Sequence, residues 1–251
     1  MENYSDKIER TYEDELLWSE TINYKGITLY PVTCQNIRDF NKLIPALVYD
    51  PLRYPTEVST LPRLYFLTDI LNHDVEYWNN NPLLGQMLIS TMGLFELVLR
   101  DQKFEFKQKE NSNKHFLRVW ISESQYIDFK AKDFEKIRQI ILVQNGVNYD
   151  DTFIHEDIRR WIEEQEKADK TPEMDIEDRI EAYMIITKCC DINKVKQVPL
   201  RQFNRILDKA FSREHYCGAL SNPMFDGKIN HWATDDNNSN SLFDKYFKEV
   251  H

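Results

Sequence analysis

Residues 83–107 read LLGQMLISTMGLFELVLRDQKFEFK, and the spacing of their apolar residues changes partway along. Large apolar residues lie three or four positions apart at Leu84, Leu88, Met92, Phe95 and Leu99, which is the period of a helix that packs against a core. From Phe104 onward apolar and charged residues alternate, which is the period of a strand with one buried face. This change of period predicts an α+β protein in which a long core helix is followed by a sheet.

Two further segments extend the strand pattern. Residues 115–121 are rich in β-branched and aromatic residues, and residues 125–129 alternate again. The polar stretch 111–113 supplies a turn between the first two strands. Between about residues 103 and 130 the sequence therefore predicts a three-stranded antiparallel meander.

Helical spacing dominates elsewhere, and it predicts helices near residues 34–48, 61–71, 134–141, 154–162, 180–187 and 200–210. Pro45 falls inside the first of these patterns, so we expect a break in the helix there. Gly146 is placed to end the helix that begins near residue 134. Tyr24 to Val32 instead predict a strand, with a turn near Lys25 and Gly26.

Changes in charge and stretches of turn-forming residues divide the chain into four parts. Residues 1–20 contain seven acidic and two basic residues, and they predict an acidic arm that is helical when docked. Residues 21–145 form an α+β body, residues 146–233 a helical module, and residues 234–251 a tether with a docking segment. The predicted fold class is α+β, predominantly helical, with a small three-stranded antiparallel sheet and a helical C-terminal module.

The last eighteen residues join a polar run to a short amphipathic segment. Residues 234–241 are too polar to contribute to a core. The segment that follows places five apolar residues on one helical face, namely Leu242, Phe243, Tyr246, Phe247 and Val250. An apolar face on a polar tether predicts a docking element. The pattern leaves open whether this element docks on its own chain or on a partner.

Composition predicts a soluble, acidic, globular protein. The net charge of -10 argues against broad nucleic-acid binding, because phosphate repels such a surface. Residues 83–99 are interrupted by polar side chains, which argues against a membrane span. The acidic N-terminus lacks the apolar run of a signal peptide, and four cysteines do not make a disulfide scaffold. We therefore expect the protein to be located in a reducing cytoplasm.

A basic stripe supports an alternative function in nucleic-acid binding. Four cationic residues recur at every fourth position of the last predicted helix, namely Arg201, Arg205, Lys209 and Arg213. Residues 180–210 also resemble two helices joined by a turn at 191–195, as in a helix-turn-helix reader. The competing interpretation is a solvated face opposite Phe203 and Leu207. The solvated-face interpretation predicts that Arg201→Ala, Arg205→Ala and Lys209→Ala together leave folding and assembly function largely intact.

The signals for a catalytic or metal site are weaker than those for the docking element and the basic stripe. His215 and Cys217, with His231 and either Cys189 or Cys190, could form a mixed set, but the compact spacing that zinc prefers is missing. The side chains of Asp150-Asp151 and His155-Glu156-Asp157 could bind a divalent ion, but acidic residues at a helix N-terminus are already explained by capping and the helix dipole. We therefore predict no enzyme, no metal and no cofactor, with an unrecognised enzyme as the third hypothesis.

Three segments carry a family resemblance: IRQIILVQNGVNYDD at 137–151, VPLRQFNRILDKAF at 198–211 and GKINHW at 227–232. Together they resemble small proteins from the tail and structural gene clusters of phages and prophages of Gram-positive bacteria, including tail assembly chaperones. The resemblance implies a non-enzymatic role in virion assembly, in the host cytoplasm or within the virion. It implies other phage tail or virion proteins, or further copies of the chain, as partners.

Overall fold

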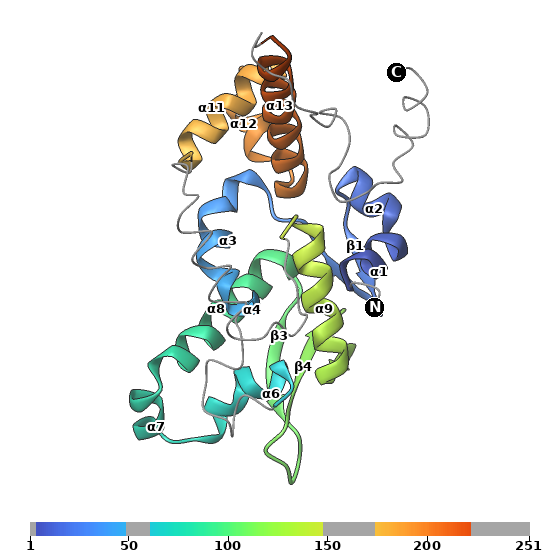
Figure 1. The fold of residues 1–251 in the computed structure, drawn as a ribbon. Helices are drawn as coiled ribbons and strands as arrows, with labels where there is room; N and C mark the ends of the chain where they lie inside the picture. The colour runs from blue at the N-terminus through green and yellow to red at the C-terminus, as the bar shows by residue number, and fades with distance from the viewer. Residues whose placement is uncertain (1–3, 49–60, 148–173, 222–251) are drawn as a thin grey trace. The chain divides into compact units, whose positions relative to one another are not determined.

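The structure is a computed structural model of the chain, and it describes residues 4–48, 61–147 and 174–221 (Figure 1). The fold is α+β and predominantly helical, with a small three-stranded antiparallel sheet, as the sequence predicted. The chain divides into two units. The first contains the described residues up to 147 together with Pro199–Arg201, and the second contains the described residues 174–198 and 202–221.

The first unit begins with α1 (Tyr4–Thr11), α2 (Glu13–Trp18), β1 (Ile22–Tyr24), β2 (Ile27–Leu29), the 3-10 helix η1 (Cys34–Asn36), α3 (Ile37–Leu43) and α4 (Pro45–Val48). It continues with α6 (Arg63–Thr68), the 3-10 helix η3 (Asp69–Asn72), α7 (Val75–Asn80), α8 (Pro82–Leu99), β3 (Phe104–Gln108), β4 (His115–Trp120), β5 (Tyr126–Phe129) and α9 (Ala131–Gln144). The second unit holds α11 (Ile176–Thr187), α12 (Ile192–Lys196) and most of α13 (Leu200–Ser221).

The core of the first unit lies where α8, α9 and the sheet meet. Phe95 of α8 stacks on Phe134 of α9, with ring centroids 5.8 Å apart, and lies 5.7 Å from Phe104 of β3. Phe106 of β3 lies 6.4 Å from both Phe95 and Phe134. Helices α3, α4, α6 and α7 and strand β2 also pack against α8. The long apolar helix is therefore the element around which the unit is built.

The three-stranded meander is confirmed. β4 pairs antiparallel with both neighbours, so Phe106, Leu117 and Phe129 lie side by side on the buried face. The opposite face carries Arg118, whose Nε and Nη2 donate to the two carboxylate oxygens of Asp128 at 2.7 and 2.8 Å. The predicted alternation therefore separates buried from exposed side chains.

Two predicted helix boundaries are also confirmed. α3 ends at Leu43 and α4 begins at Pro45, because proline cannot donate the hydrogen bond that would continue the helix. At the end of α9, Gly146 has a φ of 72°, which favours glycine. The amides of Gly146 and Val147 donate to the carbonyls of Val143 and Leu142, which is the Schellman pattern of a helix C-terminus.

The described part of the acidic N-terminal segment is helical and packed, the state expected for it when docked. It forms α1 and α2, and α1 packs against α9 (Figure 1). Ile8 and Leu16 are buried, and the segment belongs to the first unit.

Two segments differ in detail from the prediction. The predicted strand 24–32 is a hairpin of β1 and β2, joined by a turn in which Lys25 and Gly26 have φ of 48° and 90°. Two consecutive positive φ angles are typical of the type I′ turn that suits hairpins. The predicted turn at 191–195 contains the short helix α12, which starts there because the Asp191 carboxylate accepts from the Asn193 amide.

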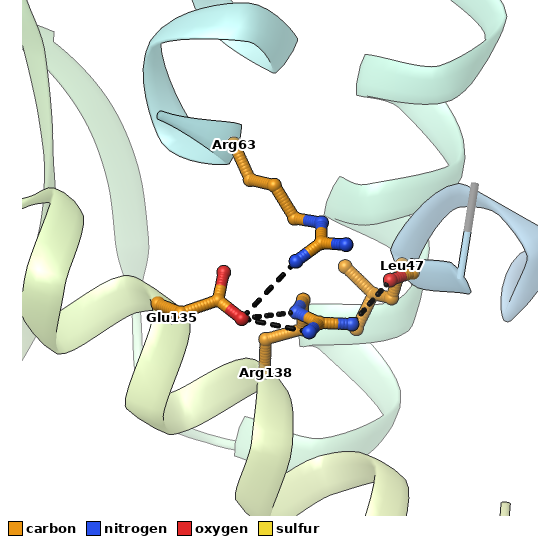
Figure 2. Close-up of polar contacts among 4 residues, drawn as sticks. All are labelled: Leu47, Arg63, Glu135 and Arg138. Atoms are coloured by element: carbon orange, nitrogen blue, oxygen red, sulfur yellow. Dashed lines mark hydrogen bonds and ion pairs between the residues drawn. The ribbon is translucent and has the colours of Figure 1, made fainter. Parts of the chain in front are cut away.

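A buried ionic network joins α6, α9 and α4 (Figure 2). The fully buried Arg138 guanidinium lies 2.7 Å from Glu135 Oε1, and its Nη1 donates to the Leu47 carbonyl at 2.8 Å. Arg63 Nη1 lies 3.2 Å from the same oxygen of Glu135. A buried guanidinium is tolerated only when its charge is compensated, so Glu135 is the residue on which this network depends.

Helix α8 is also long and apolar enough to cross a membrane by length and composition. A core helix of a soluble protein passes the same test, and half of this helix is buried in the chain.

We predict that Glu135→Ala lowers the free energy of unfolding by about 1–3 kcal/mol, because it removes the Glu135 carboxylate from the buried Arg138 guanidinium. Urea unfolding followed by circular dichroism measures the change. The matched control is Glu96→Ala, an exposed glutamate of α8, which should change stability by less than about 0.5 kcal/mol. Equal effects of the two changes would show that the network does not stabilise the fold.

Candidate functional site

The predicted basic stripe lies on α13, which packs beside α11 in the second unit. Tyr183 of α11 stacks on Phe203 of α13, with ring centroids 5.0 Å apart. Arg179 Nη2 donates to the Asn204 side-chain oxygen at 3.0 Å. Phe203 and Leu207 are buried, so the apolar side of α13 is where the sequence placed it.

Arg201 has a structural role in the first unit, whose last three residues are Pro199–Arg201. Its guanidinium donates to the Val143 carbonyl at the end of α9 and to Glu9 of α1, the latter at 2.9 Å. The neighbouring Leu200 amide donates to the Val32 carbonyl at 2.8 Å. Arg201 is therefore not part of a solvated face, because a cation beside the last carbonyls of a helix stabilises that end.

The other three residues of the stripe lie in the second unit. Arg205 and Arg213 are exposed, and Lys209 is half-buried. Burial raises the pKa of the neighbouring Asp208, although the charges of Arg179 and Lys209 act in the opposite direction. The stripe thus retains three cationic residues, with an acidic residue beside them.

The predicted docking residues Leu242, Phe243, Tyr246, Phe247 and Val250 lie outside the described residues. The same holds for His231 and for the acidic residues at 150–157. His215, Cys217 and Cys190 are exposed, and Cys189 is half-buried. Within the described ranges, no group of three or more His, Cys, Asp or Glu side chains is arranged to hold a metal ion.

A cluster of titratable side chains surrounds Asp69 of η3. The carboxylate lies 3.3 Å from Nε2 of His73 and accepts from the Tyr77 hydroxyl at 3.4 Å. Nearby, the Asn72 amide donates to the Asn113 carbonyl at 3.1 Å, which ties the β3–β4 loop to η3. Burial lowers the pKa of His115 below its ordinary value of 6.5, while the Asn113 carbonyl and Asp69 partly offset the shift. The contact between Asn72 and Asn113 holds the β3–β4 hairpin against η3.

Sequence analysis missed an exposed apolar stripe on α8. Ile89 and Met92 are 57% and 41% exposed and lie three residues apart, next to the exposed Gln86. We call Ile89 and Met92 the α8 stripe. Leu83, at the start of the helix, is 69% exposed but lies on the opposite side from Met92. The periodicity had placed Met92 in the core, but the helix is apolar on all sides, and periodicity then cannot tell which side faces water. Such a helix is ordinarily buried all round.

Comparisons with known proteins do not place the chain in a family. A scan against protein-family models finds no match, and searches of curated proteins and of solved structures find none either. The resemblance to phage tail-cluster proteins therefore stays a prediction, and function has to be inferred from the surfaces of the chain itself.

We predict that Arg201→Ala lowers the free energy of unfolding by about 1–3 kcal/mol, because it removes charge-assisted hydrogen bonds to Glu9 and Val143. Arg205→Ala, an exposed position of the same helix, should change stability by less than about 0.5 kcal/mol. Thermal and urea unfolding measure both. If Arg201→Ala keeps full stability and instead weakens binding to DNA, then Arg201 is a nucleic-acid contact.

We also predict a pH dependence from His115. The lowered pKa means that, below pH 6.5, the folded chain binds fewer protons at His115 than the unfolded chain. The stability that His115 contributes is therefore complete above pH 6.5 and is lost as the pH falls through the folded-state pKa. Urea unfolding of wild type and His115→Leu across this range should show a smaller pH dependence in the variant. His73→Gln is the control, and an unchanged slope in His115→Leu contradicts the prediction.

Proposed function

We propose that this chain is a non-enzymatic phage structural or assembly protein, either a tail assembly chaperone or a tail or virion component. It acts through protein–protein contacts. The observation that supports the proposal most directly is the α8 stripe, which leaves Ile89 and Met92 57% and 41% exposed on a helix whose other side is buried in the core.

Adjacent exposed apolar residues on one side of a helix mark a contact surface rather than scattered surface residues. The helix is fixed in position by the elements packed on its other sides, namely α3, α4, α6, α7 and β2. A partner therefore meets a preformed surface and does not have to order it, which lowers the cost of binding. The exposed Gln86 and Glu96 beside the stripe offer polar groups at its edge.

The setting of virion assembly comes from the resemblance of residues 137–151 and 198–211 to phage tail-cluster proteins. Two of the resembling features have a structural role in this chain. Gly146 ends α9, and the start of α13 packs against the end of α9 through Arg201. The described parts of residues 137–151 and 198–211 thus belong to the scaffold, which fits a family that shares a fold and has no catalytic residue to share.

The test is affinity purification of the tagged chain from cells in which the phage replicates. We expect phage tail or virion proteins to copurify with wild type and to be lost with Ile89→Ser/Met92→Ser, since centrally buried contact residues each contribute about tenfold or more to affinity. Val75→Ser is the matched control, because Val75 of α7 is 75% exposed and lies outside the stripe. Thermal melts of the variants confirm that they fold.

The outcomes separate the parts of the proposal. If no phage protein is recovered with wild type, the assembly role is wrong. If the stripe variant recovers the same phage proteins as wild type, another surface binds them. If the chain instead binds DNA with a steep salt dependence that Arg205→Glu removes, the nucleic-acid alternative replaces the proposal.

A further inference from the structure

Strand β4 carries large side chains on both sides of the sheet. Leu117 and Val119 are buried, and they alternate with Phe116, Arg118 and Trp120, which are half-buried. Successive side chains of a strand point to opposite faces, so the last three lie together on the face turned away from the core. This face of the sheet therefore carries two aromatic rings with a guanidinium between them.

These three side chains form a continuous surface with Tyr126 of β5. Tyr126 lies directly opposite Trp120 across the two strands, is 51% exposed, and has its ring centroid 6.3 Å from that of Trp120. The Arg118 guanidinium lies 3.7 Å from the centroid of the Tyr126 ring and 5.4 Å from that of Phe116. We call Phe116, Arg118, Trp120 and Tyr126 the aromatic sheet face.

The aromatic sheet face is held in place by its own contacts. Arg118 donates from Nε and Nη2 to the two carboxylate oxygens of Asp128, and its side chain is only 13% exposed. A guanidinium held at two points is a rigid support for the Tyr126 ring that lies against it. A partner therefore loses little free energy to ordering this surface.

The charges on this side of the sheet nearly cancel. Arg118 lies directly opposite Glu105 of β3 and Asp128 of β5. Lys107 lies on the same side of β3, and Lys103, which precedes the strand, adds one further positive charge. Two acidic residues thus face three basic ones. Such a balance favours a neutral partner over a phosphate backbone, which needs a clear excess of positive charge.

Two rings of the aromatic sheet face also carry hydrogen-bond donors. Within the described ranges, the indole N–H of Trp120 and the hydroxyl of Tyr126 have no hydrogen-bond partner. The sides of a helix cannot accept from them, because the helix carbonyls are bonded internally. A polyproline II segment has no internal hydrogen bonds, so its carbonyls are free to accept. Its proline rings are apolar, and its conformation is set before binding.

We propose that the aromatic sheet face binds a proline-rich segment of another protein in the polyproline II conformation. Proline rings pack on Trp120 and Tyr126, while carbonyls of the segment accept from the indole N–H and the hydroxyl. The inference goes beyond the proposed function, because the face lies on the sheet and uses no residue of the α8 stripe. Aromatic pairs across strands also stabilise sheets, so the test removes the donors and keeps aromatic rings in place.

The test is fluorescence anisotropy of a labelled decaproline peptide titrated with the full chain. We expect saturable binding that salt hardly changes, since no ion pair forms, and no binding of a Gly-Ser peptide of equal length. Tyr126→Phe keeps the ring beside Arg118 and should weaken binding about fivefold through the lost hydrogen bond. Trp120→Phe should weaken binding about tenfold or more, since it also removes contact area. The matched control is Trp18→Phe, because Trp18 of α2 is 70% exposed and lies outside the sheet.

Thermal melts and circular dichroism check that each variant folds. No binding of decaproline at chain concentrations up to about 1 mM overturns the proposal. Equal affinity of wild type and folded Tyr126→Phe/Trp120→Phe also overturns it, because the rings then serve only to pair the strands. If a labelled oligothymidylate binds instead and the double variant loses it, the face stacks nucleic-acid bases and the proposal is wrong. Copurification of phage proteins through the α8 stripe is measured separately, so neither result decides the other.

Discussion

Helix α9 ends inside the first unit, where its last residue Gln144 and the following Asn145 are buried. A buried carbonyl without a donor costs free energy comparable to a lost hydrogen bond, so the chain must bring donors to this point. Gly146 and Val147 supply two of them, and Arg201 supplies a third from much later in the sequence. Two side chains at the same helix end form hydrogen bonds with backbone groups of residues 29–32. Gln144 donates to the Leu29 carbonyl, and Asn145 accepts from the Val32 amide at 2.8 Å. The end of one helix therefore helps to hold the chain at and after β2 in place.

Local features were predictable from the sequence because their causes are local. The period of residues 84–99, the alternation that starts at Phe104 and the break at Pro45 depend on neighbours a few positions away. The environment of Arg201 was not predictable, because its partner Glu9 lies 192 positions away and helical spacing placed the residue in a solvated stripe. Met92 was misplaced for a related reason. A helix that is apolar on all sides shows where it is buried only once its neighbours are known.

The surface of the chain follows from the same packing. α8 supplies the core with one side and leaves an apolar stripe on the other, and α2 buries Leu16 while Trp18 points outward. Neither exposure helps the isolated chain, since apolar area in water gives no stability. The net charge of -10 makes copies of the chain repel one another over most of their surface.

The contact between Arg201 and Val143 also has a consequence for synthesis on the ribosome. The two residues are 58 positions apart, so α9 leaves the ribosome well before the donor that completes its end. At a translation rate of about 5–20 residues per second, the delay is roughly 3–12 s. During this interval the nascent first unit has most of its core but carries an unfinished helix end, and Glu9 and the Val32 carbonyl also lack their later partners. Ribosome pausing or truncation between residues 147 and 199 would prolong that incomplete state, in which chaperones and proteases have their best access to the chain.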